Sequence, residues 1–221
     1  MSSLVKSLCE LIYPSVNIVG EMPQPVKRPF CEQCGEMYEG ALTTRFVCTN
    51  CKERSWTLAW ARATFPMIGI VRHVILSHKY QGEFHYLNQM ADWLEEGFRR
   101  HAAIEPWDAL VSVPLHPVRR RERGFNQSHE LAKELGRRQR IPVWSCLSRR
   151  RPTSQQATLA RYGRLRNLKG AFELKSQFDV SGKTLLIVDD VFTTGATAEA
   201  CSRVLMHNNA CRVAVLTLAR A

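Results

Sequence analysis

Residues 184–197, TLLIVDDVFTTGAT, place two adjacent carboxylates, Asp189 and Asp190, directly after an apolar run. Residues 185–188 are bulky and mostly branched, which is typical of a strand buried on both faces of a parallel sheet. The carboxyl ends of such strands are where open α/β sheets bind ligands. Residues 196–208 are rich in helix formers, so we expect a helix amino terminus with unpaired N–H groups directly after the turn. The stretch therefore predicts a site for a phosphorylated sugar.

The turn after the acids carries three hydroxyls and a glycine. Thr193, Thr194 and Thr197 suit a phosphate cradle, and Gly195 permits close backbone approach and torsions that a β-carbon forbids. The ordinary alternative is a buried strand with a common strand-to-helix turn. The adjacent acids in register with Thr-Thr-Gly-Ala-Thr resemble the phosphoribosyl-pyrophosphate (PRPP) signature of type I phosphoribosyltransferases. PRPP is therefore the ligand that this resemblance implies.

The bulk properties favour one globular core with a small appendage. The chain has 221 residues, of which 45% are hydrophobic. No apolar run is as long as a membrane span, and the first residues lack the pattern of a signal peptide. We therefore expect a cytoplasmic protein, in which the eight cysteines are metal ligands or free thiols rather than disulfides.

The net charge of +11 is concentrated in one segment. Residues 117–170 contain 15 Lys or Arg and 3 Asp or Glu, whereas the rest of the chain contains 16 and 17. A concentrated basic surface indicates a site for nucleic acid or phosphorylated small molecules. The alternative, a solvated charged helix, suits residues 133–140. The cations that this alternative leaves unexplained are Arg119, Arg120, Arg121, Arg123, Arg149, Arg150 and Arg151.

Four cysteines have the spacing of a structural metal site. Cys31 and Cys34 form one Cys-x-x-Cys pair, and Cys48 and Cys51 form a second after 13 intervening residues. Two such pairs close a tetrahedral zinc site, which is structural because four thiolates fill the coordination sphere. Reduced thiols and a redox pair are the alternatives, although a redox pair favours a βαβ context that is absent here. The remaining cysteines predicted to lie in the core are Cys9, Cys146, Cys201 and Cys211.

The order of elements predicts a parallel α/β sheet flanked by helices. We expect helices at residues 68–78, 86–100 and 128–138, and strands at 107–113, 142–147, 170–174 and 211–218. Residues 56–63 are expected to pack the cysteine module onto the main body, residues 79–83 to form a turn, and residues 149–167 to form a long basic loop of the kind that acts as a lid. The chain lacks the dinucleotide and Walker motifs, which argues against those two classes.

Three motifs in one order carry a family resemblance. The stretch VPLHPVRRRERGFNQS, the downstream T-x-Q, L-x-R and R-x-R-N-x-x-G-A-F elements, and LLIVDDVFTTGAT resemble the ComF family. These are competence or DNA-uptake proteins that pair a zinc knuckle with a phosphoribosyltransferase-like domain. The likeness runs from about Cys31 to the carboxyl terminus. It implies an amino-terminal zinc segment at residues 1–55 and a type I phosphoribosyltransferase-like domain at residues 56–221.

The chain departs from the family pattern at two places. Residues 153–156 read TSQQ where family members more often carry Thr-x-Pro-Gln. Residues 80–83 read YQGE where Tyr-Arg-Gly-Asp or a close variant is more common. Both departures concern the details of the lid and the outer pocket, and they leave the phosphate site unaffected.

The resemblance also implies roles for single residues. Asp189 and Asp190 would bind the ribose hydroxyls and a magnesium ion. A loop around Arg161 and Arg164 would close over the site, and these two arginines would complete the catalytic residues. The residues implied to bind PRPP are Pro114, Leu115, His116, Arg121, Arg123, Val191, Phe192, Thr193, Thr194, Gly195, Ala196 and Thr197. The residues expected to contact nucleic acid are Arg119, Arg120, Arg149, Arg150 and Arg151.

The sequence and the family resemblance together leave three functional hypotheses. The first is a competence protein that handles imported single-stranded DNA in natural transformation, binds PRPP with magnesium and has competence or recombination proteins as partners. Phe125, Trp144 and Tyr162 lie near the basic segment and are candidates for stacking on bases. The second is an active phosphoribosyltransferase (a glycosyltransferase) of nucleotide salvage, and the third is a non-catalytic PRPP sensor. Replacing both acids with alanine is expected to abolish PRPP binding and to leave the fold intact.

Overall fold

The computed structural model describes residues 22–38, 40, 45–80, 83–150, 168 and 170–221. Its centre is a five-stranded sheet in the order β1-β7-β6-β2-β3, and every neighbouring pair is parallel. The strands are β1 (Ala61–Pro66), β2 (Ala109–Ser112), β3 (Val143–Trp144), β6 (Thr184–Phe192) and β7 (Arg212–Arg220). The expectation of a parallel α/β sheet with a small amino-terminal cysteine module is confirmed.

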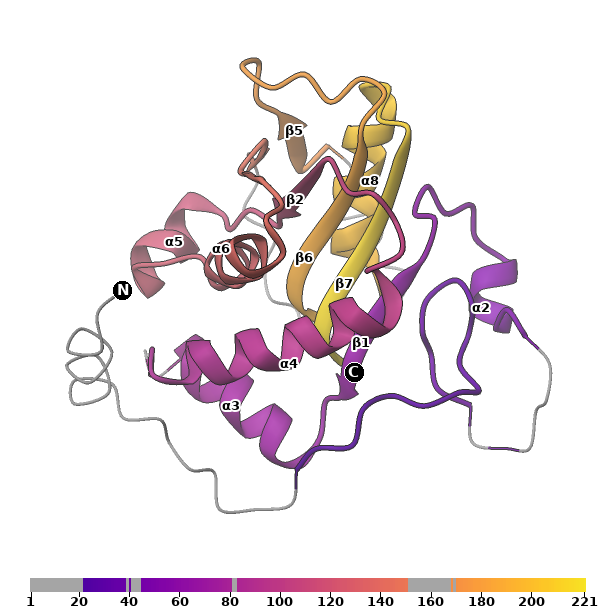
Figure 1. Cartoon of the computed structure of the whole chain (residues 1–221). Coiled ribbons are helices and arrows are strands. Elements are labelled where there is room, and N and C mark those ends of the chain that lie inside the picture. Colours follow the sequence, from indigo (N-terminus) through magenta and orange to yellow (C-terminus); the bar gives the residue numbers. More distant parts are fainter. Residues whose placement is uncertain (1–21, 39, 41–44, 81–82, 151–167, 169) are drawn as a thin grey trace.

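Helices cover both faces of this sheet (Figure 1). One face packs against α3 (Gly69–Tyr80), α4 (Tyr86–His101) and α6 (Gln127–Gln139), and the opposite face packs against α8 (Ala196–His207) and the cysteine module. Alternate residues of β6 enter the two cores, Leu186 on the first side and Ile187 on the second. The apolar run before the acids is therefore buried on both faces, as its composition predicts.

Two strands differ from the sequence-based expectation. The sequence suggested a joining segment at residues 56–63, yet β1 pairs in parallel with β7 at the edge of the sheet. Residues 170–174 were expected to join the parallel sheet, whereas β5 (Phe172–Leu174) pairs antiparallel with β4 (Leu147–Arg149) in a separate two-stranded sheet. Propensity marks a segment as a strand, but it does not say which distant segment pairs with it.

The basic motif after β2 contains a short helix that is not among the helices expected from the sequence. Helix α5 (Pro117–Arg123) begins after His116, whose Nδ1 accepts a hydrogen bond from the backbone N–H of Val118 at 3.3 Å. It ends at Gly124, which has a φ of 78°. One cysteine prediction is also wrong: Cys211 is exposed because it precedes β7. Cys146 and Cys201 are buried as predicted, and Cys9 lies outside the described residues.

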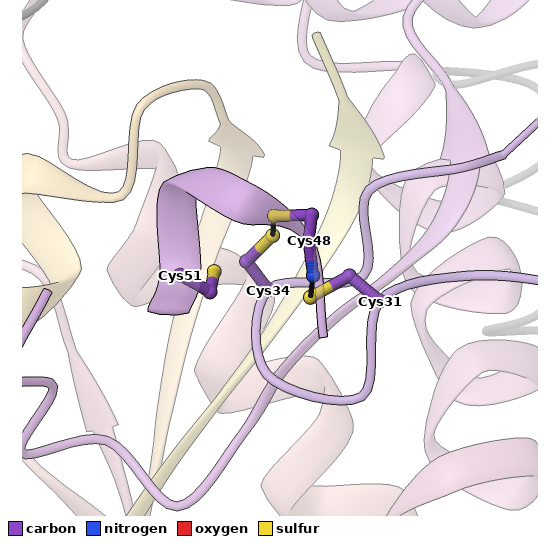
Figure 2. A group of neighbouring side chains, drawn as sticks. All are labelled: Cys31, Cys34, Cys48 and Cys51. Atoms are coloured by element: carbon purple, nitrogen blue, oxygen red, sulfur yellow. Dashed lines mark hydrogen bonds between the residues drawn. The ribbon is translucent and has the colours of Figure 1, made fainter. Parts of the chain in front are cut away.

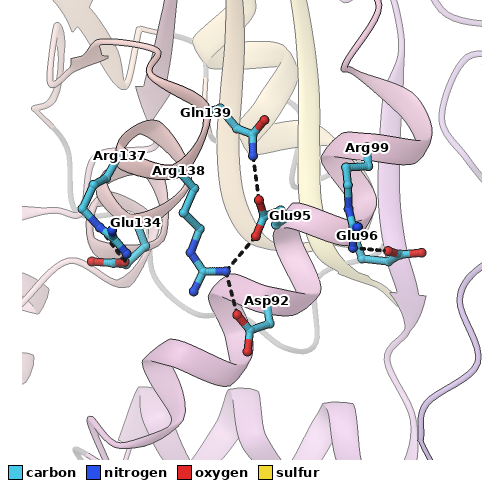
Figure 3. Close-up of polar contacts among 8 residues, drawn as sticks. All are labelled: Asp92, Glu95, Glu96, Arg99, Glu134, Arg137, Arg138 and Gln139. Atoms are coloured by element: carbon cyan, nitrogen blue, oxygen red, sulfur yellow. Dashed lines mark hydrogen bonds and ion pairs between the residues drawn. The ribbon is translucent and has the colours of Figure 1, made fainter. Parts of the chain in front are cut away.

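The charged face of α6 is largely committed to ion pairs within the protein (Figure 3). Arg138 Nη1 lies 2.6 Å from an Asp92 carboxylate oxygen and 2.9 Å from a Glu95 oxygen, which joins α6 to α4. Arg137 pairs with Glu134 on its own helix at 2.9 Å. The interpretation of residues 133–140 as a charged helix is therefore supported. Among the described helices, none has the length and apolar character that a membrane crossing requires.

The cysteine module packs on β1 through backbone hydrogen bonds and one half-buried arginine. The Ala61 N–H donates to the Gln33 carbonyl at 2.8 Å, and Arg62 pairs with Glu32 at 3.0 Å. The Arg62 guanidinium also stacks over the Phe30 ring at 4.8 Å. These contacts tie the module to the sheet. The division of the chain at residue 55 stays a prediction.

The stability of this junction is expected to fall at acidic pH because of His101, whose ring lies edge-on to Phe30. Burial, reinforced by Arg62 and Arg100, lowers the pKa of His101 to about 4. The folded state thus favours the neutral ring, so its contribution is present above the unfolded pKa of about 6.5 and is lost as the pH falls toward 4. We expect a loss of about 1–2 kcal/mol in unfolding free energy, because the ring is partly exposed to solvent. Urea unfolding between about pH 7.5 and pH 4.5 measures this slope.

His101→Gln removes the titrating group and serves as the comparison. The variant should show a flatter dependence of unfolding free energy on pH than the unaltered protein. An identical slope in both proteins would contradict the assignment to His101.

Candidate functional site

The two acids lie where β6 loses one of its neighbours. Pairing between β2 and β6 ends at Ser112 opposite Val188, whereas β6 continues beside β7 as far as Phe192. The sequence suggested that the strand ends at the two acids. In the structure, β6 instead continues past Asp190 to Phe192. Because β2 stops first, the edge of β6 at Asp189 and Asp190 is open to side chains from other elements.

The amino terminus of α6 supplies side chains to this edge. Ser128 Oγ donates to Asp189 Oδ1 at 2.6 Å, and Gln127 Nε2 donates to Asp190 Oδ2 at 3.4 Å. The N-cap Asn126 accepts a hydrogen bond from the Ser128 N–H at 3.2 Å, which fixes the first turn. Carboxylates beside a helix amino terminus are stabilised by the unpaired N–H groups there. Helix α6 therefore orients the acid pair.

A lysine that the sequence analysis missed completes the acid site. Lys79, near the end of α3, places Nζ 2.7 Å from Asp190 Oδ2. The Lys79 side chain is 20% exposed and that of Asp190 only 6%, so this ion pair is largely removed from water. The sequence placed residues 79–83 in a turn. The sequence signal that could have pointed to Lys79 is the amphipathic helix before it. That helix continues to Tyr80, and its last turn contains Lys79 and the buried His78.

The surroundings shift the two carboxyl groups in opposite directions. Burial and the charge of Asp190 raise the pKa of Asp189 to about 6. Burial acts on Asp190 in the same sense, but the Lys79 ammonium outweighs it and holds the pKa of Asp190 below its usual range. Asp190 is consequently the carboxyl group that holds its negative charge more firmly, and Asp189 takes up a proton more readily than an ordinary aspartate.

The donor set of the acids suits a hard cation. Ser128 and the Asp190 N–H both donate to Oδ1 of Asp189, and Lys79 and Gln127 both contact Oδ2 of Asp190. Each carboxylate therefore keeps a second oxygen to which no group in the described ranges donates. Two carboxylate oxygens are ligands that magnesium accepts in proteins. Asp189 and Asp190 fit the predicted magnesium role by residue type.

The turn after the acids has the conformation that its glycine predicts. Gly195 has a φ of 76°, and a β-carbon there would lie 2.5 Å from the Phe192 ring and 2.7 Å from the Trp56 ring. Helix α8 begins at the next residue, so its unpaired N–H groups follow the turn directly. Thr193 is exposed, and Thr194 and Thr197 are half-buried. Residues 193–197, called the phosphate loop below, thus form a tight bend with its threonine side chains at least partly accessible.

A cavity of about 800 Å³ lies on the other side of the α6 amino terminus. Asn126 and His129 line it, whereas the intervening Gln127 and Ser128 contact the acids. The residues lining it that the sequence predicted to bind PRPP or nucleic acid are Pro114, Leu115, Arg120, Arg121 and Arg149. Lys175 and His129 line it too, and the sequence analysis selected neither. His129 Nδ1 lies 3.1 Å from the Ser145 hydroxyl. This cavity, called the basic cleft below, therefore shares one helix turn with the acids.

Other predicted cations lie elsewhere. Arg119 pairs with Glu122 at 3.0 Å, and Arg150 pairs with Glu173. Arg123 stacks over the Tyr80 ring at 5.1 Å, and its charge helps to lower the pKa of Asp190. The predicted residues Arg151, Arg161, Tyr162 and Arg164 lie outside the described residues.

The two described aromatic candidates for base stacking pack against other rings. The centre of the Phe125 ring lies 4.7 Å from that of Phe84 and 5.0 Å from that of His78, and Phe125 lines the basic cleft as well. Trp144 lies 6.0 Å from Phe178. Phe125 is therefore the aromatic side chain that combines internal packing with access to the cleft.

The four cysteines of the two pairs come together, as their spacing predicts (Figure 2). Their sulfur atoms all lie within 4.8 Å of one another. Two come from the turn after Phe30 and two from α2 (Thr49–Lys52) with its N-cap. Gly35 follows the first pair with a φ of 68°, and a β-carbon there would meet the Ala61 carbonyl at 3.0 Å. The cluster can hold one metal ion, and four thiolates are a ligand set typical of zinc.

Comparison with known proteins gives clear relatives. No family model matches the chain. Competence protein F of Haemophilus influenzae is 30% identical over 201 residues, which cover 87% of this chain and 85% of that protein. DNA utilization protein YhgH of Escherichia coli (strain K12) is 41% identical over 123 residues, 55% of this chain. That alignment spans about half, 53%, of the length of the E. coli protein.

Similarity to solved structures is weak. A hypoxanthine phosphoribosyltransferase from Staphylococcus aureus shares 14% sequence identity with this chain and gives a TM-score of 0.39. The superposition covers 61% of this chain and 64% of that chain. A TM-score at this level is too low to support an inference, so the assignment depends on the sequence relatives.

Proposed function

This chain belongs to the ComF family of competence proteins, and from that premise we propose that it handles imported single-stranded DNA while binding PRPP and magnesium. The observation that carries the proposal is the first turn of α6. Its residues contact the acid pair on one side and line the basic cleft on the other. A phosphorylated sugar and a nucleic-acid strand would thus bind next to each other. We also propose that the protein acts in the cytoplasm with competence or recombination proteins as partners.

At the proposed PRPP site the chain's own residues divide the ligand between them. Asp189 and Asp190 accept hydrogen bonds from the ribose hydroxyls, and the phosphate loop holds the 5′-phosphate on its N–H groups. Arg121 and Arg123 pair with the pyrophosphate, as their planar guanidinium groups favour. Magnesium, when bound to the acids, supplies positive charge to the pyrophosphate. The roles of Arg161 and Arg164 in closing the site and excluding water stay predictions.

The basic cleft supports the proposed contact with DNA. Arg120, Arg149 and Lys175 line it, and Phe125 offers a ring within it. A positively charged groove with an aromatic side chain is the usual arrangement for single strands bound without sequence preference. Arg119, Arg150 and Arg151 were predicted to contact DNA as well. The first two form ion pairs with glutamates, so we assign them a smaller contribution.

Binding of single-stranded DNA is expected to weaken steeply with salt. Each phosphate contact contributes a slope of about −0.7 in a plot of log affinity against log salt concentration. Replacing Arg120 and Arg149 with methionine should make the slope less negative by about 1.4. Arg137→Met is the matched control, because Arg137 is an exposed arginine of α6 paired with Glu134. Fluorescence anisotropy measures the affinities. Equal slopes for the cleft variant and the control would contradict the assignment of the cleft.

Calorimetry with PRPP and magnesium tests the other half of the proposal and separates the two alternatives. Binding that requires magnesium is the expected result. Pyrophosphate release with one of a panel of bases would favour an active phosphoribosyltransferase, whereas binding of PRPP without DNA binding would favour a sensor. Absence of PRPP binding would reject the proposed site.

A further inference from the structure

We propose that the four-cysteine module sets the conformation of the phosphate loop, so that metal binding by the cysteines raises the affinity for PRPP. The positioning residues are Arg54 and Arg220. The identity of the ligand, PRPP, rests on the function proposed above. The structural coupling between the cysteine module and the phosphate loop does not depend on that function. The cysteines and the phosphate loop lie far apart in the sequence, whereas the fold connects them through Arg54, Arg220 and Trp56.

Arg54 is the first link between the module and the loop. It follows α2, and its backbone N–H donates to the carbonyl of the buried ligand residue Cys51 at 3.3 Å. Its Nη1 donates to the Thr194 carbonyl at 3.2 Å. The guanidinium also lies 5.7 Å from the Trp56 ring centre, which holds the side chain in place. The position of the second cysteine pair therefore determines where a carbonyl of the phosphate loop finds its donor.

Arg220 is the second link, and it reaches the module through Glu36. Its Nη1 donates to the Thr193 carbonyl at 2.7 Å, and its Nη2 pairs with Glu36. Glu36 lies between the two cysteine pairs, and its carbonyl accepts a hydrogen bond from the Cys31 N–H at 2.8 Å. The Arg220 side chain is 6% exposed. A buried guanidinium thus connects the first cysteine pair to the carbonyl that precedes Thr194.

Packing adds a third connection. The Trp56 ring occupies the space beside Gly195, where a β-carbon would come within 2.7 Å of it. The Thr57 N–H donates to the Glu199 carboxylate at 3.1 Å, and Glu199 belongs to the first turn of α8. The segment that leaves the cysteine module therefore supports both the glycine of the loop and the helix that follows it.

The consequence for binding follows from where the carbonyl groups are held. With the Thr193 and Thr194 carbonyls bound to arginines, the loop keeps one backbone conformation and offers its N–H groups to an anion. Without metal, the two turns lose the ion that would join their four sulfurs, and small metal modules of this kind lose their structure. Arg54 and Glu36 then lose their fixed positions, and the loop must be ordered at the expense of binding affinity. Because linkage between two binding equilibria is reciprocal, PRPP should also raise the affinity of the cysteines for metal.

The test uses the full-length, metal-loaded chain and the substitution Arg54→Met. We expect this variant to retain its zinc, to bind PRPP with magnesium about tenfold more weakly, and to exchange the amide hydrogens of residues 193–197 faster. Arg45→Met is the control, because Arg45 is an exposed arginine of the same module. Calorimetry, elemental analysis and hydrogen exchange with mass spectrometry give the three readouts. Unchanged affinity and unchanged exchange in Arg54→Met would overturn the proposal.

Two further measurements keep the result decisive. Glu36→Gln weakens the second link without placing a new group in the core, and it should also speed exchange in the loop. Removal of zinc from the unaltered protein with a chelator should do the same. If the unaltered protein binds no PRPP, the proposed function fails, but the exchange data still decide the coupling. Equal loop exchange with and without metal would reject it.

Discussion

Replacing Asp190 with asparagine is expected to abolish magnesium-dependent PRPP binding and to lower the free energy of unfolding by about 3 kcal/mol. The stability loss comes from Lys79, whose ammonium lies 2.7 Å from the Asp190 carboxylate in a largely buried site. Removing one partner of such a pair leaves a charge without compensation, which costs more than the pair contributes as a whole. Chemical denaturation measures the stability and calorimetry the binding.

A second substitution separates the two effects. In the double variant Lys79→Met with Asp190→Asn the unpaired charge is gone, so most of the stability should return while PRPP binding stays absent. Asp189→Asn is the matched single variant. It perturbs the hydrogen bond from Ser128 but leaves the Lys79 ion pair in place, and we expect a loss of about 1 kcal/mol. Equal stability of Asp190→Asn and the unaltered protein would contradict a desolvated ion pair.

The ion pair also changes what the double alanine variant should do. From the sequence, replacement of Asp189 and Asp190 was expected to leave the fold intact. With Lys79 in the site, that variant keeps a largely buried ammonium without its partner. The loss of binding remains the expected result, but it must be interpreted together with a stability measurement, or with Lys79 replaced as well.

Replacing Cys31 and Cys34 with serine is expected to remove one zinc ion per chain and to unfold the cysteine module. Four sulfur atoms within 4.8 Å of one another form a closed ligand set, so loss of two leaves no tetrahedral site. Structural zinc contributes on the order of 10 kcal/mol to the folding of small modules. The effect should extend beyond the module, because Cys31, Cys34 and Cys51 pack in the same core as β6 and α8. Elemental analysis and thermal unfolding measure both parts.

Cys211→Ser provides the control for this experiment, since Cys211 is exposed and lies outside the cluster. It should keep its metal and its melting temperature. An unaltered protein that is purified without metal under reducing conditions, and that does not take up added zinc, would contradict the assignment.

Local sequence patterns were sufficient to predict most helices and strands. They were also sufficient to select the residues of the two candidate centres, the acid pair with its phosphate loop and the four-cysteine cluster. The run before Asp189 is apolar at every position, so it predicts a strand buried on both faces, and the helix periods of α3, α4 and α6 are visible in the spacing of their apolar residues. The grouping of Cys31, Cys34, Cys48 and Cys51 follows from the reach of two tight turns. In each case, neighbours in the sequence carry the information.

The remaining features depend on contacts between distant segments. The pairing of β1 with β7 and the antiparallel partnership of β4 with β5 have no local signal, because a strand propensity does not name its partner. Lys79 reaches Asp190 only because α3 packs in the same core as β6, and Arg54 donates to Thr194 across 140 residues of sequence. The sequence alone determined which residues are candidates to bind a phosphate, a cation and a structural metal. The tertiary structure decided which side chains hold them in place, because burial and ion pairing arise when the chain packs.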